Sequence, residues 1–382
     1  MIMKKNEVLT TIVFLIAFLV YSICMFMWGM LNNARYFGIF LGIIQSSVVF
    51  IFRNLSLHRS KEKIKSKNIL FILVLGALFF FLSYFKAKAN GLGMSDRVIV
   101  QISYLTIPAL YAFLIINIIS IKTWHKLMKF ILITSIILYI FSVGIGNFFS
   151  INEWLMISGG NSPFESSTYS GIFTISAFYF QYYGEISDYK DKKMRIYLIL
   201  SVAFSIFSWK RLSVLFVFLI WFVGRYFDFN RKVSKFFSLI TALIFCEATT
   251  IYTQFVEGNL SLFNINAYQF TTGRTYTLSL WKAYGYISAG YGSSYDFIHR
   301  YLEMDLVQMY LEIGFIAVLF FSLCYFNLVG NNFYGYCVMV YEFLNLLTAS
   351  SFPSVFEWIL ILVFIGSLGF ESSIKGERLH GN

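Results

Sequence analysis

The chain has 382 residues, of which 58% are hydrophobic and only 13% are charged, and it contains 45 Phe. Soluble domains carry roughly 25% charged residues, so this composition excludes a soluble protein and indicates a polytopic helical membrane protein. A net charge of +11 would suggest nucleic acid as a partner for a soluble protein, but here it indicates cytoplasmic loops facing anionic lipid. We therefore expect one integral membrane domain over residues 1–382, with membrane lipid and no nucleic acid as partner.

Twelve apolar segments, separated by polar or basic stretches, predict an all-α bundle of about 12 transmembrane helices. Their approximate ranges in chain order are 9–30, 36–52, 69–85, 98–120, 130–149, 171–183, 196–209, 212–224, 236–255, 306–326, 335–352 and 355–370. The first segment follows Lys4 and Lys5 and has no small-residue cleavage site, so we expect it to be retained as a span.

The basic residues are distributed unevenly over the loops between these segments. Most of the 30 Lys and Arg residues lie in loops on the same side as the N-terminus, including the basic stretches 53–67 and 122–129. The positive-inside rule then places both termini in the cytoplasm and the longest loop, 256–305, on the outer side between helices 9 and 10.

The chain shows no pattern typical of a metal or disulfide site. Its cysteines all fall within apolar runs and are Cys24, Cys246, Cys324 and Cys337, which argues against a disulfide framework or a zinc site. No paired aspartates or His/Cys cluster with metal-ligand spacing occurs on the outer side, so we expect no metal and no cofactor.

Arg274 in the large loop is the first candidate functional residue. Thr272 is expected to cap a helix that places Arg274, Leu278 and Trp281 on one face, and Gly273 would let a ligand approach the backbone. A cation in the first turn of a helix is unfavourable unless an anion neutralises it, and free backbone N–H groups beside a guanidinium suit a phosphate. The alternative is an interfacial arginine that reaches lipid headgroups.

A second cationic candidate lies between two apolar segments, at Lys210 and Arg211. Positive residues are disfavoured on the outer side, and a charge between two short spans needs a partner. This pattern predicts a second phosphate contact, with a plain surface loop as the alternative.

Three residues of the large loop are candidates for a general base. His299 is the histidine predicted on the outer side, and Glu303 and Asp305 follow it; an imidazole or a carboxylate can accept a proton near neutral pH. Arg300 beside them is a further candidate anion ligand. The alternative for such a charged stretch at a loop edge is simple solvation.

Aromatic residues are dense in the same loop, and Trp281, Tyr276 and Tyr291 are predicted to stack on sugar rings. The alternative is the aromatic belt at the membrane surface. Acidic residues within or at the ends of apolar segments are costly in a bilayer and are expected to be functional, or to pair with Lys210, Arg211 or Arg274. They are Glu247, Glu312, Glu342 and Glu357.

Between Thr271 and Gly314 the chain contains, in order, the motifs TTGRT, LW, GYGSSYDF, a His and LEIG. This series resembles the O-antigen polymerase (Wzy) family and the related O-antigen ligases. The stretch SWKRLSV at 208–214 resembles the second outer arginine of that superfamily. The topology resembles the family over the whole chain, whereas the sequence resemblance covers about 60 residues. These motifs are short and degenerate.

The resemblance implies a metal-independent glycosyltransferase of the bacterial inner membrane, with its active site in the periplasm, that acts in lipopolysaccharide biosynthesis. Arg211 and Arg274 would bind the pyrophosphate of an undecaprenyl-linked donor, with Lys210 and Arg300 as further ligands. The growing glycan would pass to a lipid-linked repeat unit, the acceptor, and a chain-length regulator is a further candidate partner.

One departure from the family pattern distinguishes its two branches. The ligases usually carry His-Asn about eleven residues before the glycine that corresponds to Gly314, and that position here is Glu303. His299 lies too early, which favours Glu303 or Asp305 as base and a polymerase over a ligase.

Three other functions compete with a polymerase. An O-antigen ligase would transfer glycan to lipid A-core with the same chemistry. A flippase or transporter for lipid-linked sugars would distribute its charges along a central cavity, whereas this chain concentrates them in one long loop. A membrane scaffold would leave Arg211 and Arg274 unexplained.

Overall fold

The computed structural model describes residues 2–26, 34–56, 67–150, 152–153, 162–186, 193–226, 233–261, 267–271, 273–300, 302–330 and 332–379. Within these residues every extended regular element is a helix, which confirms the predicted all-α class. The chain forms two compact units. Unit 1 comprises Met1–Ser66, Leu110–Arg231 and Phe356–Asn382, and unit 2 comprises Lys67–Ala109 and Lys232–Val355.

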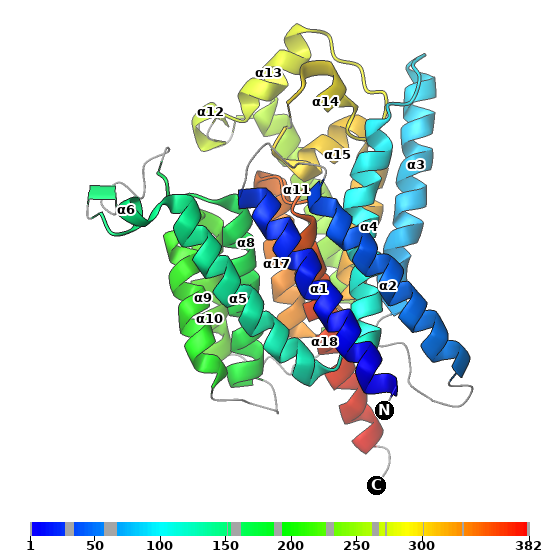
Figure 1. The fold of residues 1–382 in the computed structure, drawn as a ribbon. Coiled ribbons are helices and arrows are strands. Elements are labelled where there is room, and N and C mark those ends of the chain that lie inside the picture. The colour runs from blue at the N-terminus through cyan, green and yellow to red at the C-terminus, as the bar shows by residue number, and fades with distance from the viewer. Residues whose placement is uncertain are drawn as a thin grey trace. The chain divides into compact units, whose positions relative to one another are not determined.

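Unit 1 contains the helices of the N-terminal and middle parts of the chain (Figure 1). They are α1 (Ile2–Phe26), α2 (Ala34–Ser56), α5 (Ile121–Val143), α6 (Ile145–Phe148), α8 (Ser167–Gln181), the π-turn η2 (Tyr182–Ile186), α9 (Met194–Phe207) and α10 (Arg211–Tyr226), together with nearly all of α18 (Val355–Leu379). The helix α4 (Arg97–Ile118) runs from unit 2 into unit 1.

Unit 2 combines long helices with the short helices of the large loop. They are η1 (Lys67–Leu70), α3 (Phe71–Ala89), α11 (Lys235–Val256), α12 (Ala267–Phe270), α13 (Thr275–Ala283), α14 (Ser293–Ile298), α15 (Asp305–Ile313), α16 (Phe315–Leu328) and α17 (Phe333–Thr348). The predicted loop 256–305 therefore carries three helices of its own, α12 to α14.

Six helical stretches are long and apolar enough to cross a membrane: Lys5–Phe26, Ala34–Arg53, Lys67–Ala89, Arg97–Ile118, Ile121–Val143 and Lys235–Val256. Four shorter apolar helices are Met194–Phe207, Arg211–Phe222, Phe315–Leu328 and Val355–Leu368. This is the arrangement of a multi-pass membrane protein. The count of 12 spans, the positions of the termini and the outer location of the large loop stay predictions.

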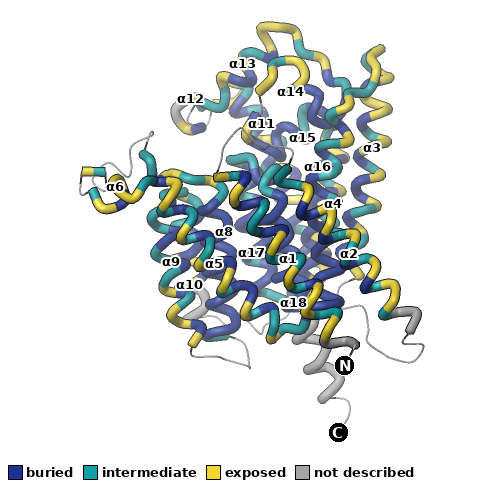
Figure 2. The backbone as a smooth tube through the Cα atoms, viewed as in Figure 1, coloured by how far each residue is buried: buried dark blue, intermediate teal, exposed yellow. Residues whose placement is uncertain are grey.

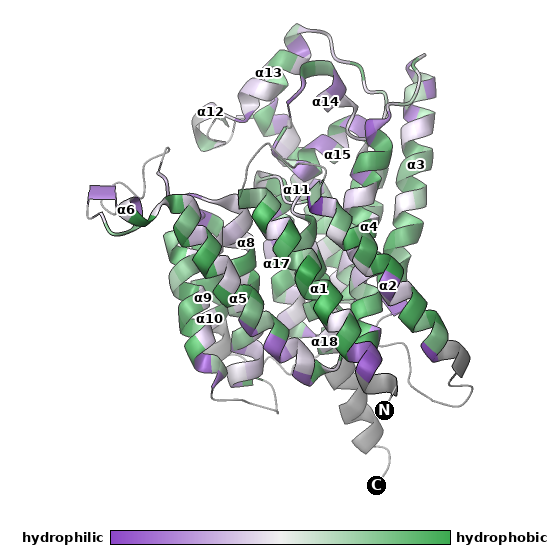
Figure 3. Cartoon of the chain, in the orientation of Figure 1, coloured by the Kyte–Doolittle hydropathy of each residue, from purple (hydrophilic) through white to green (hydrophobic). Residues whose placement is uncertain are grey.

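Most residues along helices such as α1, α2 and α3 are hydrophobic (Figure 3), and a number of them are exposed. On α2, for example, Phe37 is 64% exposed and Ile44 is 61% exposed, and on α11 Ile244 is 59% exposed. Large exposed apolar surfaces are unfavourable in water but suit acyl chains. Glu247 is also exposed on α11 among these side chains, so the expectation that it pairs with a basic residue has no support in the described residues.

The start of α5 differs from its prediction. The basic stretch 122–129 was interpreted as a link, but the helix begins at Ile121. Ser120 is its N-cap and accepts a hydrogen bond from the Thr123 amide. The carboxylate of Glu7 accepts hydrogen bonds from the Ser120 amide at 3.0 Å and the Thr123 hydroxyl at 2.6 Å. This capping satisfies the first turn, so the helix extends through the basic residues.

The predicted tenth segment, 306–326, is also wrong as a single helix. Gly314 separates α15 from α16 and has φ of +92°, a conformation that glycine adopts without a steric penalty. The nine-residue α15 carries Asp305, Gln308 and Glu312, whereas α16 contains no charged residue. Gly314 therefore separates a short helix with polar side chains, α15, from the apolar helix α16.

The core of unit 1 is built around α8, whose residues from Tyr169 to Gln181 are all buried (Figure 2). Its polar side chains bond to the neighbouring helices: Ser170 donates to Ser213 at 3.0 Å, and Thr174 pairs with Ser205 at 3.0 Å. A Cβ on Gly171 would collide with the carboxylate of Glu357. Glycine at this position thus allows a buried acidic side chain to lie against the α8 backbone.

Candidate active site

The turn before α13 holds Arg274 in a defined position. Gly273 adopts φ of +87°, and the Arg274 guanidinium donates to the Thr271 carbonyl at 3.1 Å. Its Nε lies 3.6 Å from a carboxylate oxygen of Glu303, with side-chain exposures of 24% for Arg274 and 63% for Glu303. The structure therefore brings together one predicted phosphate ligand and one predicted base. Thr272, the predicted cap, lies outside the described residues.

The expectation of free backbone N–H groups at this helix start is wrong. The Thr275 amide donates to the Thr271 hydroxyl at 3.4 Å, the Tyr276 amide to the Gly273 carbonyl at 3.0 Å, and the Thr277 amide to the Arg274 carbonyl at 3.1 Å. The tight turns use the donors that a phosphate would need. Any anion at this position would depend on the Arg274 side chain and not on the backbone.

The segment that leads to Glu303 is conformationally unusual. His299 has φ of +52° and Glu303 has φ of +57°, and non-glycine residues in this left-handed region are uncommon and strained. Both side chains are exposed, and the His299 ring lies 6.3 Å from the Tyr295 ring, centroid to centroid. Such strain often accompanies functional loops, and here it affects two of the three predicted bases.

Asp305, the third predicted base, has a different environment. It is 5% exposed, and its carboxylate accepts hydrogen bonds from the Ser350 hydroxyl at 3.0 Å and from the amides of Ser351 at 2.7 Å and Phe352 at 3.0 Å. Burial raises its pKa to about 6, while these three bonds oppose the shift. The carboxylate fastens the start of α15 to the segment after α17, and this geometry favours Glu303 over Asp305 as the base.

Glu312 anchors the turn that carries the GYGSS sequence. Its carboxylate accepts hydrogen bonds from the amides of Gly292 at 2.5 Å and Ser294 at 3.0 Å, from Gln308 Nε2 at 3.2 Å and from the Tyr286 hydroxyl at 3.3 Å. The side chain is fully buried, and burial raises its pKa to about 7. The expected pairing of Glu312 with a basic residue is therefore replaced by bonds to backbone amides.

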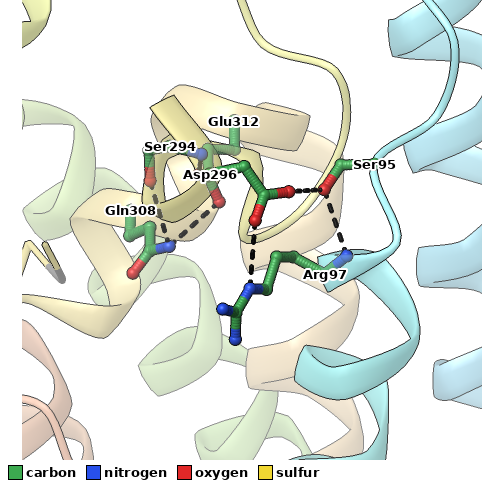
Figure 4. A network of polar contacts seen from close by, with 6 residues as sticks. All are labelled: Ser95, Arg97, Ser294, Asp296, Gln308 and Glu312. Carbon is green, nitrogen blue, oxygen red and sulfur yellow. Dashed lines mark hydrogen bonds and ion pairs between the residues drawn. The ribbon is translucent and has the colours of Figure 1, made fainter. Parts of the chain in front are cut away.

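A second link holds the same region to the start of α4 (Figure 4). Arg97 Nε donates to Asp296 at 3.0 Å, and the Ser95 hydroxyl donates to the other Asp296 oxygen at 2.5 Å. The Arg97 guanidinium also lies 4.1 Å from the centre of the Tyr295 ring. Sequence reasoning missed this link because Arg97 and Asp296 are far apart in the chain, and the motif GYGSSYDF that contains Asp296 does not indicate its partner.

The predicted sugar-binding aromatics lie in three different environments. Trp281 is 5% exposed and lines a cavity of about 330 Å³ together with Leu278 of the same helix. Tyr276 is 51% exposed on the other side of α13. Tyr291 is 2% exposed and packs edge-on against Phe79, so in this conformation it presents no surface to a ligand.

The remaining predicted cations are divided between the two units. Lys210 and Arg211 belong to unit 1, where Arg211 is exposed at the first position of α10. Arg300 belongs to unit 2 and is exposed. Of the predicted cations and bases, the structure thus brings together Arg274 and Glu303.

No cluster of three or more His, Cys, Asp or Glu side chains suited to a metal ion occurs in the part of the chain that the structure describes. The four cysteines are free and show no disulfide.

Comparisons with known protein families, with curated proteins and with solved structures find no match to this chain. The resemblance to the O-antigen polymerase family stays a prediction based on its short motifs. The function has to be argued from the residues themselves.

Proposed function

We propose that this protein is an O-antigen polymerase, a metal-independent glycosyltransferase of the bacterial inner membrane. It joins undecaprenyl-pyrophosphate-linked repeat units at the periplasmic face. The observation that carries the proposal is the pairing of Arg274 with Glu303 at 3.6 Å. A guanidinium and an exposed carboxylate in one place supply the two functions that transfer from a pyrophosphate requires.

The chemistry needs one cation and one base. The acceptor hydroxyl gives its proton to the Glu303 carboxylate while its oxygen forms a bond to the anomeric carbon of the donor sugar. The bond from that carbon to the pyrophosphate oxygen breaks, and the electron pair leaves with undecaprenyl pyrophosphate. Arg274 stabilises the charge that develops on this leaving group, and a guanidinium does so through two parallel hydrogen bonds.

The ion pair supplies a resting state for this mechanism. When no substrate is bound, Glu303 neutralises Arg274 and orders its side chain, which reduces the entropic cost of binding. An incoming pyrophosphate carries more negative charge than one carboxylate and displaces Glu303 from the guanidinium. The freed carboxylate then lies close to the bound donor, where a base is needed.

The decisive experiment is a lipopolysaccharide gel from a strain that lacks the gene, complemented with wild-type or variant protein. Core bearing a single repeat unit in the deletion strain is expected for a polymerase, because flipping and ligation still proceed. Bare core alone would contradict the proposal and indicate a ligase or a flippase. Accumulation of outer lipid-linked polymer would then identify the ligase.

Arg274→Ala is expected to abolish long glycan, a loss of about 10²–10³-fold in polymer, the effect of removing one preorganised stabilising donor. Arg274→Lys should restore only part of it, because an ammonium lacks the planar fork. Arg195→Ala is the control, since Arg195 also forms an ion pair with a glutamate, Glu185, at 4.0 Å, although its side chain is more exposed than that of Arg274. Normal chain lengths from Arg274→Ala at wild-type membrane levels would overturn the site assignment.

A further inference from the structure

The cavity beside Trp281 is a second feature of unit 2 with the character of a binding site. It has a volume of about 330 Å³, at the lower end of the range of about 300–1,000 Å³ that is typical of small-ligand sites. Its lining comes from α3, α13 and α15, from the residues that follow α3 and α11, and from the loop after α13. The lining residues used in the argument below are Lys86, Asn90, Glu257, Trp281, Lys282 and Tyr286.

One wall of the cavity is a fixed aromatic surface. The Trp281 ring lies 4.9 Å from the Tyr286 ring, centroid to centroid, and the two planes are inclined by 48°. Tyr286 is itself held by hydrogen bonds to Ser293 at 2.6 Å and to Glu312 at 3.3 Å. Trp281 is 5% exposed, so a small part of its ring faces the cavity, and this part is held in place without a further loss of side-chain entropy. Such a wall suits the apolar face of a sugar ring.

Other lining residues of the cavity are polar and charged. Lys282 donates to the Glu257 carbonyl at 3.0 Å and lies 3.8 Å from its carboxylate, so these two charges largely compensate each other. Asn90 donates its amide to the Ser288 carbonyl at 2.7 Å, which leaves its side-chain oxygen as an acceptor toward a ligand. Amide, carboxylate and ammonium groups around an aromatic ring are the donors and acceptors that sugar hydroxyls require.

Lys86 determines the net charge of the cavity. It is exposed at the C-terminal end of α3, and no carboxylate in the described part of the chain forms an ion pair with it. With Lys282 compensated by Glu257, the lining carries one uncompensated positive charge. An uncompensated cation beside a cavity attracts an anionic ligand.

From these observations we propose that the cavity binds an acidic sugar of the glycan repeat unit. The ring of this sugar packs on Trp281, and its acid group pairs with Lys86. The inference rests on the proposed function, because it assigns the cavity to the glycan on which the polymerase acts. It also specifies the chemical class of one sugar of that glycan, an acidic sugar.

The test is direct binding to the purified full-length protein in uncharged lipid nanodiscs. The ligands are the methyl glycosides of galacturonic and glucuronic acid, each compared with methyl galactoside or methyl glucoside, and affinities are measured by saturation-transfer NMR. At least one acidic sugar is expected to bind about tenfold more tightly than its neutral counterpart, since one charge-assisted contact distinguishes them. Equal affinities, or binding of neither sugar, would overturn the proposal.

Lys86→Gln and Lys88→Gln form a matched pair of variants. Both lysines are exposed in the last turn of α3 and make the same contribution to the helix dipole, but only Lys86 lines the cavity. Lys86→Gln should reduce the affinity for the acidic sugar to that of the neutral one, and Lys88→Gln should leave it unchanged. Equal effects of the two variants would contradict the assignment, as would inorganic phosphate that competes as well as the acidic sugar.

The failure of this inference can be distinguished from failure of the proposed function. If Arg274→Ala abolishes long glycan while Lys86→Gln binds acidic sugar normally, the polymerase proposal stands and the cavity assignment fails. If the acidic sugar binds through Lys86 while Arg274→Ala makes normal polymer, the cavity assignment stands and the catalytic one fails.

Discussion

The two predicted phosphate-binding arginines stand at the starts of two helices, but their surroundings differ. Arg274 precedes α13 in unit 2, follows a left-handed glycine and is held by Glu303 and the Thr271 carbonyl. Arg211 begins α10 in unit 1, follows a left-handed residue at Trp209 with φ of +47°, and is exposed. Among the described residues no carboxylate forms an ion pair with Arg211.

Arg274 is a cation that is already held in position, whereas Arg211 is an exposed cation that no carboxylate among the described residues occupies. Arg274 is already ordered, so it can stabilise a leaving group without a further entropic cost, but it has to exchange one anion for another. Arg211 has no carboxylate to release but has to be ordered when a ligand binds. Two arginines at helix starts therefore need not have equal roles, and the following variants measure how unequal their roles are.

Glu303→Gln should have the largest effect, because it removes the proposed base. The loss expected for a general base is about 10²–10⁴-fold in polymer formed, while binding of the donor is retained or improved since Arg274 loses its competing anion. The measurement is the rate of polymerisation in membrane vesicles at saturating donor, together with donor affinity. An unchanged rate would transfer the role of base to His299.

Arg211→Ala should have a smaller effect than Arg274→Ala. Removal of one charge-assisted contact costs about 1.5–3 kcal/mol, which corresponds to about 10- to 150-fold and should appear mainly as weaker donor binding. Arg211→Lys should recover part of this loss. If Arg211→Ala equals Arg274→Ala in rate at saturating donor, the two arginines act at the same step and the comparison fails.

Glu312→Gln should reduce stability and change its dependence on pH. Replacing one acceptor oxygen by an amide leaves a buried N–H of Gly292 or Ser294 without its acceptor, at a cost of about 1–3 kcal/mol. Burial raises the pKa of Glu312 to about 7 from an unfolded value of 4.5, so the native state holds a proton that the unfolded state releases between these values. Its contribution to stability is complete below pH 4.5 and is lost as the pH rises through 7.

The matching measurement is the thermal midpoint of wild-type and Glu312→Gln protein in detergent from pH 4.5 to pH 8. The difference between the two proteins should become smaller as the pH rises, because the wild type loses the contribution of Glu312. Asp305, whose pKa is also raised, contributes to the pH dependence of both proteins. Its contribution cancels when the midpoint of the variant is subtracted from that of the wild type. A difference that does not vary with pH would show that Glu312 is ionised throughout.

Asp296→Asn should have the smallest effect. Its ion pair with Arg97 has side-chain exposures of 33% and 47%, and pairs of this kind contribute about 0.2–1 kcal/mol because water screens them. The thermal midpoint should change little, and polymer length should not change. A large loss of polymer with unchanged stability would instead assign the link between Arg97 and Asp296 to the active site.

The fold class could be predicted from the sequence because apolar segment length depends on the thickness of the bilayer. Helix ends were less predictable where they depend on partners distant in the chain. Glu7 caps α5 from a position more than a hundred residues away, so the basic residues 122–129 gave no signal of their helical state. Gly314 was visible in the sequence, but the apolar residues of α15 and the apolar run of α16 together read as one segment, which concealed the break.

The candidate site was predictable only in part. Arg274, Glu303 and Trp281 were candidates because they lie in the longest polar stretch between two apolar segments. Lys86, Asn90 and Glu257 were missed, since each lies at the end of a helix where a polar residue is ordinary. The role of Glu312 depends on backbone amides, which carry no sequence signature, although GYGSS followed by a buried glutamate is a pattern that could identify it elsewhere.

The buried position of α8 has a consequence for how the protein reaches the membrane. Its Ser170, Thr174 and Gln181 are all buried, and the last donates to the Ile220 carbonyl at 3.3 Å. A helix with this many polar groups partitions poorly into lipid by itself, and its partners are on α9 and α10. We therefore expect α8 to leave the translocon only when these two later helices have been synthesised, so that the three enter the bilayer as one assembled group.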